Sequence, residues 1–201
     1  MNTTGATSTH SWSTNAVHYA ADLAASLGAS FRVVDDHIEI SYQQAKPFLA
    51  IVGSAPVRRL PCPVLSVPSD AVFAGVKKIV IACDRGDLLA TVADHQELLD
   101  DLFHFLGSSF ELIHIARDGE ASLQRMIREY QGWKGRPAFL PASPFVIRRQ
   151  KLQQGITDYF KNHTADWLMV LPKEHGWIEF HRSQAETIAQ EAPIPVLRVY
   201  E

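Results

Sequence analysis

The stretch Pro61-Cys-Pro-Val-Leu-Ser-Val67 returns near the other end of this chain as Pro193-Ile-Pro-Val-Leu-Arg-Val199. An apolar run precedes each copy: Leu49-Ala-Ile-Val-Gly53 stands before the first and Trp167-Leu-Met-Val-Leu171 before the second. Self-similarity of this kind indicates a repeated unit of structure rather than a catalytic motif. The sequence therefore predicts two related units, each of which ends in the same strand.

The two units are unequal in length. Residues 1–70 are available to the first unit and residues 75–201 to the second. The connection after the apolar run covers residues 54–60 in the first unit and residues 172–192 in the second, so the first unit has no room for a last helix. Its amphipathic segment Ser13–Gly28 predicts a helix that ends at glycine. The strands expected in the first unit are Phe31–Val34, Phe48–Val52 and Pro63–Val67.

In the second unit, continuous apolar runs alternate with segments of helical periodicity. The strands expected there are Ile79–Cys83, Phe110–Ala116, Pro137–Pro141, Trp167–Leu171 and Pro195–Tyr200. The helices expected there cover residues 88–106, 121–130, 149–163 and 183–192. Strands that alternate with helices pair in parallel through right-handed crossovers. The predicted fold class is α/β, a three-layer sandwich with a parallel five-stranded sheet, plus a truncated copy of the same unit.

Composition excludes several classes of protein. The chain has 201 residues, is 46% hydrophobic and 20% charged, and carries a formal net charge of -3, which is typical of a globular protein without a broad basic surface. We therefore expect no nucleic-acid partner. The first residues lack the pattern of a signal peptide, and no apolar run reaches membrane-spanning length. Cys62 and Cys83 have no metal-ligand or redox spacing, which indicates buried thiols and a cytoplasmic location.

Several of these segments, taken together, resemble the universal stress protein family in its tandem two-module form. Lys77–Asp84 resembles the family's opening strand, which ends in Asp, and Ala165–Val170 resembles the strand before the ligand loop. Ser11–Ala24 resembles the family's first helix, and the two Pro-x-Pro-Val-Leu-x-Val endings complete the set. The resemblance implies an adenine nucleotide alpha hydrolase-like fold, in which the repeated endings meet about a pseudo-twofold axis. It also implies a ligand crevice at the carboxyl edge of the sheet, with Asp84 near the adenine.

The phosphate-binding loop of nucleotide-binding members departs from the family pattern in this chain. That loop has Gly-x-x-Gly and then, about nine residues later, Gly-Ser or Gly-Thr, because glycine lets backbone N–H groups approach phosphate oxygens. Here Leu171, Glu174 and Arg182 stand at the glycine positions, and Pro172 removes one N–H donor. The ligand-binding residues that the resemblance implies are Ala82, Cys83, Asp84, Val170, Leu171, Lys173, Arg182 and Ser183.

Structural roles compete with these assignments. Capping of the following helix by Asp84 or Asp87 explains Asp84 better than a ligand contact does, and a capping box with Glu186 likewise explains Ser183 better. Lys173 and Arg182 could instead hold a small anion such as phosphate or sulfate through their side chains. A metal site at His175 and His181 would need further ligands that the sequence does not identify, so no metal is predicted.

No catalytic motif of a hydrolase, a P-loop enzyme, a zinc protease or a dinucleotide-binding enzyme occurs in the sequence. We therefore expect a non-catalytic, stress-associated binding or regulatory protein whose nucleotide site is degenerate and which has no cofactor. We also expect a homodimer, because a second chain would close the surface that the missing elements leave bare. The alternatives are an adenine-nucleotide-binding universal stress protein with at most weak ATP hydrolysis, a scaffold without a small ligand, and a sensor of another metabolite.

Overall fold

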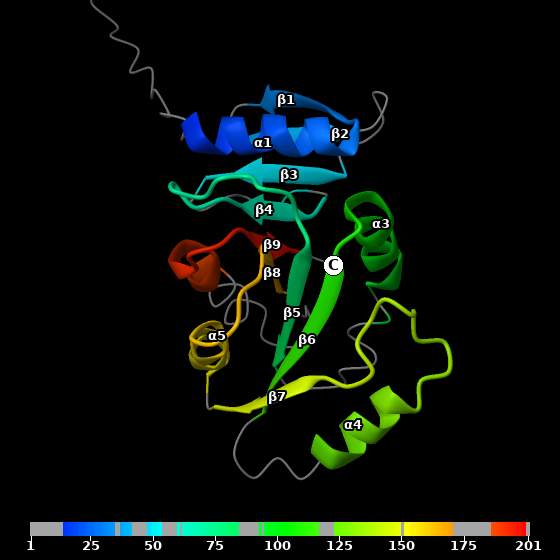
Figure 1. The fold of residues 1–201 in the computed structure, drawn as a ribbon. Coiled ribbons are helices and arrows are strands. Elements are labelled where there is room, and N and C mark those ends of the chain that lie inside the picture. The colour runs from blue at the N-terminus through cyan, green and yellow to red at the C-terminus, as the bar shows by residue number, and fades with distance from the viewer. Residues whose placement is uncertain are drawn as a thin grey trace, which may run out of the picture.

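The computed structural model describes residues 14–34, 37–41, 48–53, 60, 62–84, 93, 95–116, 123–149, 151–170 and 186–199. Its strands form one mixed nine-stranded sheet with the order β1-β2-β3-β4-β9-β8-β5-β6-β7 (Figure 1). The strands are β1 (Ser30–Val34), β2 (His37–Ser41), β3 (Leu49–Val52), β4 (Val64–Ser66), β5 (Lys78–Asp84), β6 (Ser109–Ala116), β7 (Phe145–Arg148), β8 (Trp167–Val170) and β9 (Val196–Arg198). The helices are α1 (Thr14–Leu27), α3 (Gln96–Leu106), α4 (Leu123–Gln131) and α5 (Leu152–Phe160), and residues 186–191 are also helical.

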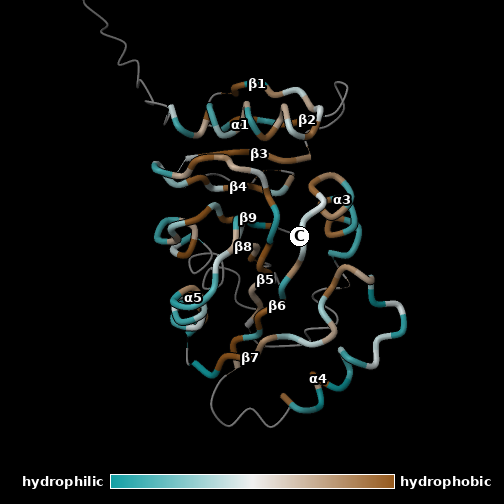
Figure 2. The backbone as a smooth tube through the Cα atoms, viewed as in Figure 1, coloured by the Kyte–Doolittle hydropathy of each residue, from teal (hydrophilic) through white to brown (hydrophobic). Residues whose placement is uncertain are grey.

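Helices cover both faces of the sheet. Alternate residues of a strand point to opposite faces, so Ile79 and Ile81 of β5 belong to one hydrophobic cluster and Val80 and Ala82 to another. The first cluster also contains residues of α1, α3 and α4, and the second contains residues of α5 and of the helix over residues 186–191. The strands in the middle of the sheet are mainly hydrophobic, whereas hydrophobic and hydrophilic residues alternate along the helices (Figure 2). The prediction of an α/β fold is therefore confirmed.

The arrangement of the sheet corrects one part of that prediction. From β9 to β7 every neighbouring pair of strands is parallel, as the alternation of strands and helices predicted. This section is not a separate sheet, because β4 continues it and leads on to β3, β2 and β1. All nine strands share one mixed sheet, and the predicted parallel five-stranded sheet is one section of it.

The third strand of the parallel section lies later in the chain than predicted. The expected strand Pro137–Pro141 is wrong, since these residues form a turn in which Leu140 N donates to Pro137 O at 3.1 Å. Proline has no N–H to donate to a neighbouring strand, which disfavours such a segment inside a sheet. Phe145–Arg148 pairs with β6 instead, with Ile113 opposite Phe145.

Two predicted helices are shorter in the structure, or lie partly outside the residues that it describes. The helix expected over residues 149–163 covers only Leu152–Phe160, because Arg149 N still donates to Ala116 O as part of the strand pairing. Of the helix expected over residues 88–106, the described part contains α3 from Gln96 onward. Gly107 ends α3 with a φ of 63°, a backbone conformation that glycine adopts without strain.

The two repeated endings pair with each other, as expected. β4 and β9 are antiparallel, with Leu65 opposite Leu197, Val64 opposite Arg198 and Ser66 opposite Val196. Exchanging the two strands reproduces the same set of pairs, so a pseudo-twofold axis passes through the pair of leucines.

The symmetry extends to the next strands on either side. β3 is parallel to β4 with Ala50 opposite Val64, and β8 is parallel to β9 with Leu168 opposite Val196. Ala50 N donates to the carbonyl of Pro63 at 2.9 Å, and Leu168 N donates to the carbonyl of Pro195 at 2.9 Å. The strand pairs β3–β4 and β8–β9 are therefore equivalent in register as well as in sequence.

Beyond these pairs the two halves differ. β2, a strand that was not predicted, occupies the place that β5 has in the other half. Leu27-Gly-Ala-Ser-Phe31 after α1 matches Leu106-Gly-Ser-Ser-Phe110 after α3, so β1 corresponds to β6. β5 lies between β6 and β8 and is parallel to both, whereas β2 lies between β1 and β3 and is antiparallel to both. The signal that was missed is the alternation in His37–Ser41, where Ile38 and Ile40 are fully buried.

A buried hydrogen bond connects the two halves across the sheet. Trp167 of β8 has no exposed surface, and its indole N–H donates to the hydroxyl of Tyr19 of α1 at 2.7 Å. Burial raises the pKa of Tyr19 to about 12, so the phenol is neutral at physiological pH. An unsatisfied N–H at this depth would be costly, so the bond fixes α1 over the parallel section.

Replacing Tyr19 by Phe is expected to lower the free energy of unfolding by about 1–3 kcal/mol, because the indole N–H of Trp167 stays buried without its acceptor. Urea denaturation of the full chain measures this loss. Trp167→Phe and the double variant complete a double-mutant cycle, in which the second change should cost less once the first is present. Additive losses would contradict the role assigned to this bond.

Removal of residues 1–70 is expected to cause aggregation or non-native self-association, because β9 then loses β4 and becomes an unpaired edge. Light scattering coupled to size-exclusion chromatography measures the mass of the remaining fragment. A monomeric fragment with the thermal stability of the full chain would show that the two halves are independent.

Candidate functional site

The carboxyl edge of the parallel section contains the described part of the predicted ligand site. β5 and β8 are parallel neighbours with Ala82 opposite Val170, and Cys83 and Asp84 follow at the end of β5. Open α/β sheets bind ligands at this edge, where the strands end. Four predicted residues therefore meet at one place in the fold. The other four, Leu171, Lys173, Arg182 and Ser183, lie outside the described residues, as do His175 and His181.

Three of these four residues are part of the hydrophobic core. Ala82 and Val170 belong to the cluster under α5, and Cys83 belongs to the cluster on the opposite face. All three are buried. Their side chains therefore support the edge of the sheet, and their contribution to a ligand would come from the backbone. For Asp84 the structure places the backbone, opposite Ile115 of β6.

Arg149, which follows β7, forms an ion pair with Asp158 of α5. Arg149 Nε donates to Asp158 Oδ2, and Lys161 Nζ lies 2.6 Å from Asp158 Oδ1. Lys161 and Arg149 together lower the pKa of Asp158, so the carboxyl is ionised and balances the charge of Arg149. Arg149 is thereby connected to α5 through Asp158.

Arg198 is a buried cation beside the site that the sequence analysis missed. It lies opposite Val170 in the pairing of β8 with β9, and only 2% of its surface is exposed. Its Nη2 donates to Ser66 Oγ at 2.8 Å, across the antiparallel pair of β4 and β9. The signal in the sequence is the second of the two variable positions of the repeated ending, where the first copy has Ser66 and the second has Arg198. The side chains at this position connect the two halves directly.

The corresponding edge of the other half has a different chemistry, because β2 begins there instead of ending. Glu39 lies 2.6 Å from the Arg32 guanidinium and 3.2 Å from His37 Nε2. The hydrogen bond from Arg32 and then that from His37 lower the pKa of Glu39. Burial and the charge of Glu39 raise the pKa of Cys62 to about 11, which keeps this thiol protonated. The β1–β2 pair therefore carries an ion-paired carboxylate, and the thiol of Cys62, which precedes β4 at the opposite edge, is inert.

Comparisons with solved structures identify related folds. A universal stress protein from Archaeoglobus fulgidus matches with a TM-score of 0.54 and 14% identity over 77% of this chain and 61% of its own. A putative universal stress protein from Pseudomonas aeruginosa matches with a TM-score of 0.56 and 15% identity over 76% of this chain and 63% of its own. A functionally unknown protein from Pseudomonas aeruginosa matches with a TM-score of 0.55 and 15% identity over the same shares.

This is the universal stress protein fold. The identity is too low to show more than the fold, and the chain spans about three fifths of the length of these structures. No protein-family model and no curated protein matches the sequence. Among the described residues, no helix is long and apolar enough to cross a membrane, and no group of three or more His, Cys, Asp or Glu side chains could hold a metal ion.

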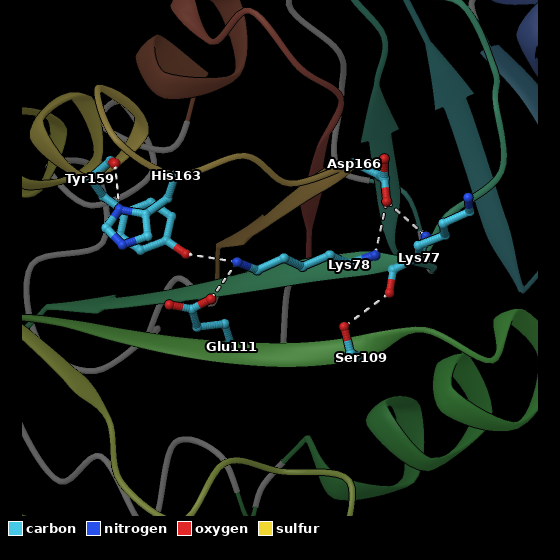
Figure 3. A network of polar contacts seen from close by, with 7 residues as sticks. All are labelled: Lys77, Lys78, Ser109, Glu111, Tyr159, His163 and Asp166. Atoms are coloured by element: carbon cyan, nitrogen blue, oxygen red, sulfur yellow. Dashed lines mark hydrogen bonds and ion pairs between the residues drawn. The ribbon is translucent and has the colours of Figure 1, made fainter.

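A second group of polar side chains lies at the opposite edge, where β5 and β6 begin (Figure 3). Lys78 Nζ lies 2.5 Å from Glu111 Oε2 and 3.3 Å from the hydroxyl of Tyr159. The ring of His163 stacks on Tyr159 with a centroid distance of 4.3 Å, and Asp166 Oδ2 accepts the backbone N–H of Lys78 at 2.8 Å.

This group holds α5 against the sheet and does not activate a nucleophile. Burial and the hydrogen bond to Glu111 raise the pKa of Tyr159, so its phenol stays protonated. Burial alone would raise the pKa of Glu111, but the bonds from Lys78 and Tyr159 outweigh it and lower that pKa. The neutral phenol of Tyr159 lies between the ammonium group of Lys78 and the carboxylate of Glu111, and these contacts stabilise the position of α5.

Glu111→Gln is expected to destabilise the fold at neutral pH by an amount that shrinks as the pH falls. The folded pKa of Glu111 lies below the unfolded value of about 4.3, so its stabilisation is complete above that value and is lost as the pH falls through the folded pKa. Urea denaturation of both proteins between about pH 7 and pH 3 measures the difference. In a Lys78→Met background the substitution should lose most of its pH dependence. A difference that is constant over the whole range would refute the assignment.

Proposed function

We propose that this chain is a non-catalytic, stress-associated binding or regulatory protein of the universal stress protein type, with a degenerate nucleotide site. The observation that carries the proposal is the combination of this fold with Leu171, Glu174 and Arg182 at the three glycine positions of the family's phosphate loop. A side chain at these positions keeps backbone N–H groups away from phosphate oxygens, and Glu174 adds a like charge.

The proposal includes the tandem form of the family, with residues 1–70 as a shortened module and residues 75–201 as a complete one. The equal registers of β3–β4 and β8–β9 support it, since two modules of one ancestry would keep the same strand pairing. The reversed direction of β2 supports the shortening, because that strand fills the place of an opening strand that the first module lacks.

The non-catalytic part of the proposal is supported by the state of the reactive side chains. Cys62 has a pKa of about 11, and Tyr19 and Tyr130 have pKa values of about 12, in each case mainly because of burial. A nucleophile or general base needs a pKa nearer to the working pH. These groups are instead neutral and inert in neutral solution.

We further propose that the chain forms a homodimer and works in the cytoplasm. β1 is an edge strand of the sheet, and its Phe31 and Val33 are 39% and 52% exposed on the face that α1 covers elsewhere. An exposed edge with apolar side chains favours pairing with a second chain. Neither Cys62 nor Cys83 is part of a disulfide, and a reducing compartment keeps thiols in that state.

Titration calorimetry with Mg-ATP tests the proposal. The full chain is expected to show no site tighter than about 100 μM, because backbone contacts to the phosphates are lost. A variant with glycine in place of Leu171, Glu174 and Arg182 is the matched comparison and should bind at least about tenfold more tightly. Asp84→Ala in that variant should weaken binding again. A sub-micromolar site in the unmodified chain would favour the alternative, an adenine-nucleotide-binding universal stress protein.

A further inference from the structure

A half-enclosed groove lies on the pseudo-twofold axis, on the face of the sheet that α1 and α3 share. Its volume is about 390 Å³, and both halves of the chain contribute to its walls. Leu49 at the start of β3 and Trp167 at the start of β8 form equivalent parts of its floor. Pockets that hold small organic molecules have volumes of about 300–1,000 Å³ and often lie between structural units. The size and place of this groove therefore suit one small molecule.

The ends of two helices give the groove a negative electrostatic character. Leu27 is the last residue of α1, Leu106 is the last residue of α3, and both line the groove. A helix carries a partial negative charge at its carboxyl end, where the last carbonyl groups have no partner within the helix. These two ends line one cavity, and so does the first turn of α3, whose partial charge is positive and which carries Glu97.

Side chains strengthen this character. Glu97 and Asp101 lie one turn apart on α3 and line the groove together with His95 at the start of that helix, and among the described residues no lysine or arginine lines it. Among the described residues, neither carboxylate takes part in an ion pair. The rest of the lining is mainly apolar and includes the ring of Phe105. An occupant therefore meets mainly apolar walls and two carboxylates that form no ion pair among the described residues.

We propose that the groove binds a small, mainly apolar molecule that carries a protonated amine. Its apolar part displaces water from the walls formed by Leu49, Trp167 and Phe105, and its ammonium group lies toward Glu97 and Asp101. The same charges disfavour nucleotides and other anions. The groove is distinct from the crevice beyond Asp84, because it is lined by Trp167 at the start of β8, whereas Asp84 ends the parallel strand β5. The proposal does not depend on the outcome of the ATP titration.

Ligand-observed NMR with the full chain tests the proposal, using phenylbutylamine as the probe and phenylbutyrate as its anionic counterpart. Phenylbutylamine is expected to bind with a Kd on the order of 1 mM, as its size allows. Phenylbutyrate should bind at least about fivefold more weakly, because its charge has the wrong sign. Equal affinity for the two probes, or no binding of the amine, would overturn the proposal.

Three variants locate the site. The double variant Glu97→Gln/Asp101→Asn should remove most of the preference for the amine, whereas Asp100→Asn, an exposed control on the same helix outside the groove, should leave it unchanged. Leu98→Trp should fill the cavity and abolish binding of the amine. Because that variant could also disturb folding, the charge variants decide the result independently. An unchanged preference in Glu97→Gln/Asp101→Asn would also overturn the proposal.

Discussion

The antiparallel pairing of β4 with β9 is the constraint on which the rest of the molecule depends. Each of these strands ends one half of the chain, and without the other each would present a row of unpaired backbone groups. The pairing makes one sheet of two halves and also makes one core. A single hydrophobic cluster contains Leu23 of α1, Leu65 of β4, Leu197 of β9 and Leu112 of β6. Neither half therefore has a core of its own on this face of the sheet.

The direction of β2 makes the two halves chemically different although their registers match. In the parallel section, β5 and β8 end at the same edge, and this edge presents the backbone of Asp84. In the other half β2 begins at the equivalent edge, which is occupied by the ion-paired group of Arg32, His37 and Glu39. The two equivalent edges of the sheet therefore differ in strand direction as well as in the composition of the loops that follow.

Much of the fold could be predicted from the sequence, because continuous apolar runs and helical stripes report burial directly. β2 was missed because its apolar residues, Ile38 and Ile40, alternate with polar ones over only five positions. The prediction of a strand at Pro137–Pro141 was wrong because it gave more weight to the apolar residues of this segment than to its two prolines, which have no N–H to donate.

The site was predicted less well than the fold. The sequence shows which residue types follow each strand, but it does not show which side chains point into the core, as those of Ala82 and Val170 do. Arg198 was missed because a charged residue near a strand end usually indicates solvent exposure, and here a neighbouring strand buries it. The groove depends on two segments that are far apart in the chain, so no local pattern reports it.

The bond between Ser66 and Arg198 spans 132 positions along the chain. During synthesis at about 5–20 residues per second, β4 leaves the ribosome on the order of ten seconds before its partner strand exists. Throughout that interval the nascent first half has an incomplete sheet and an exposed apolar edge. The contact that joins the two halves therefore forms late, and non-local contacts of this kind slow folding.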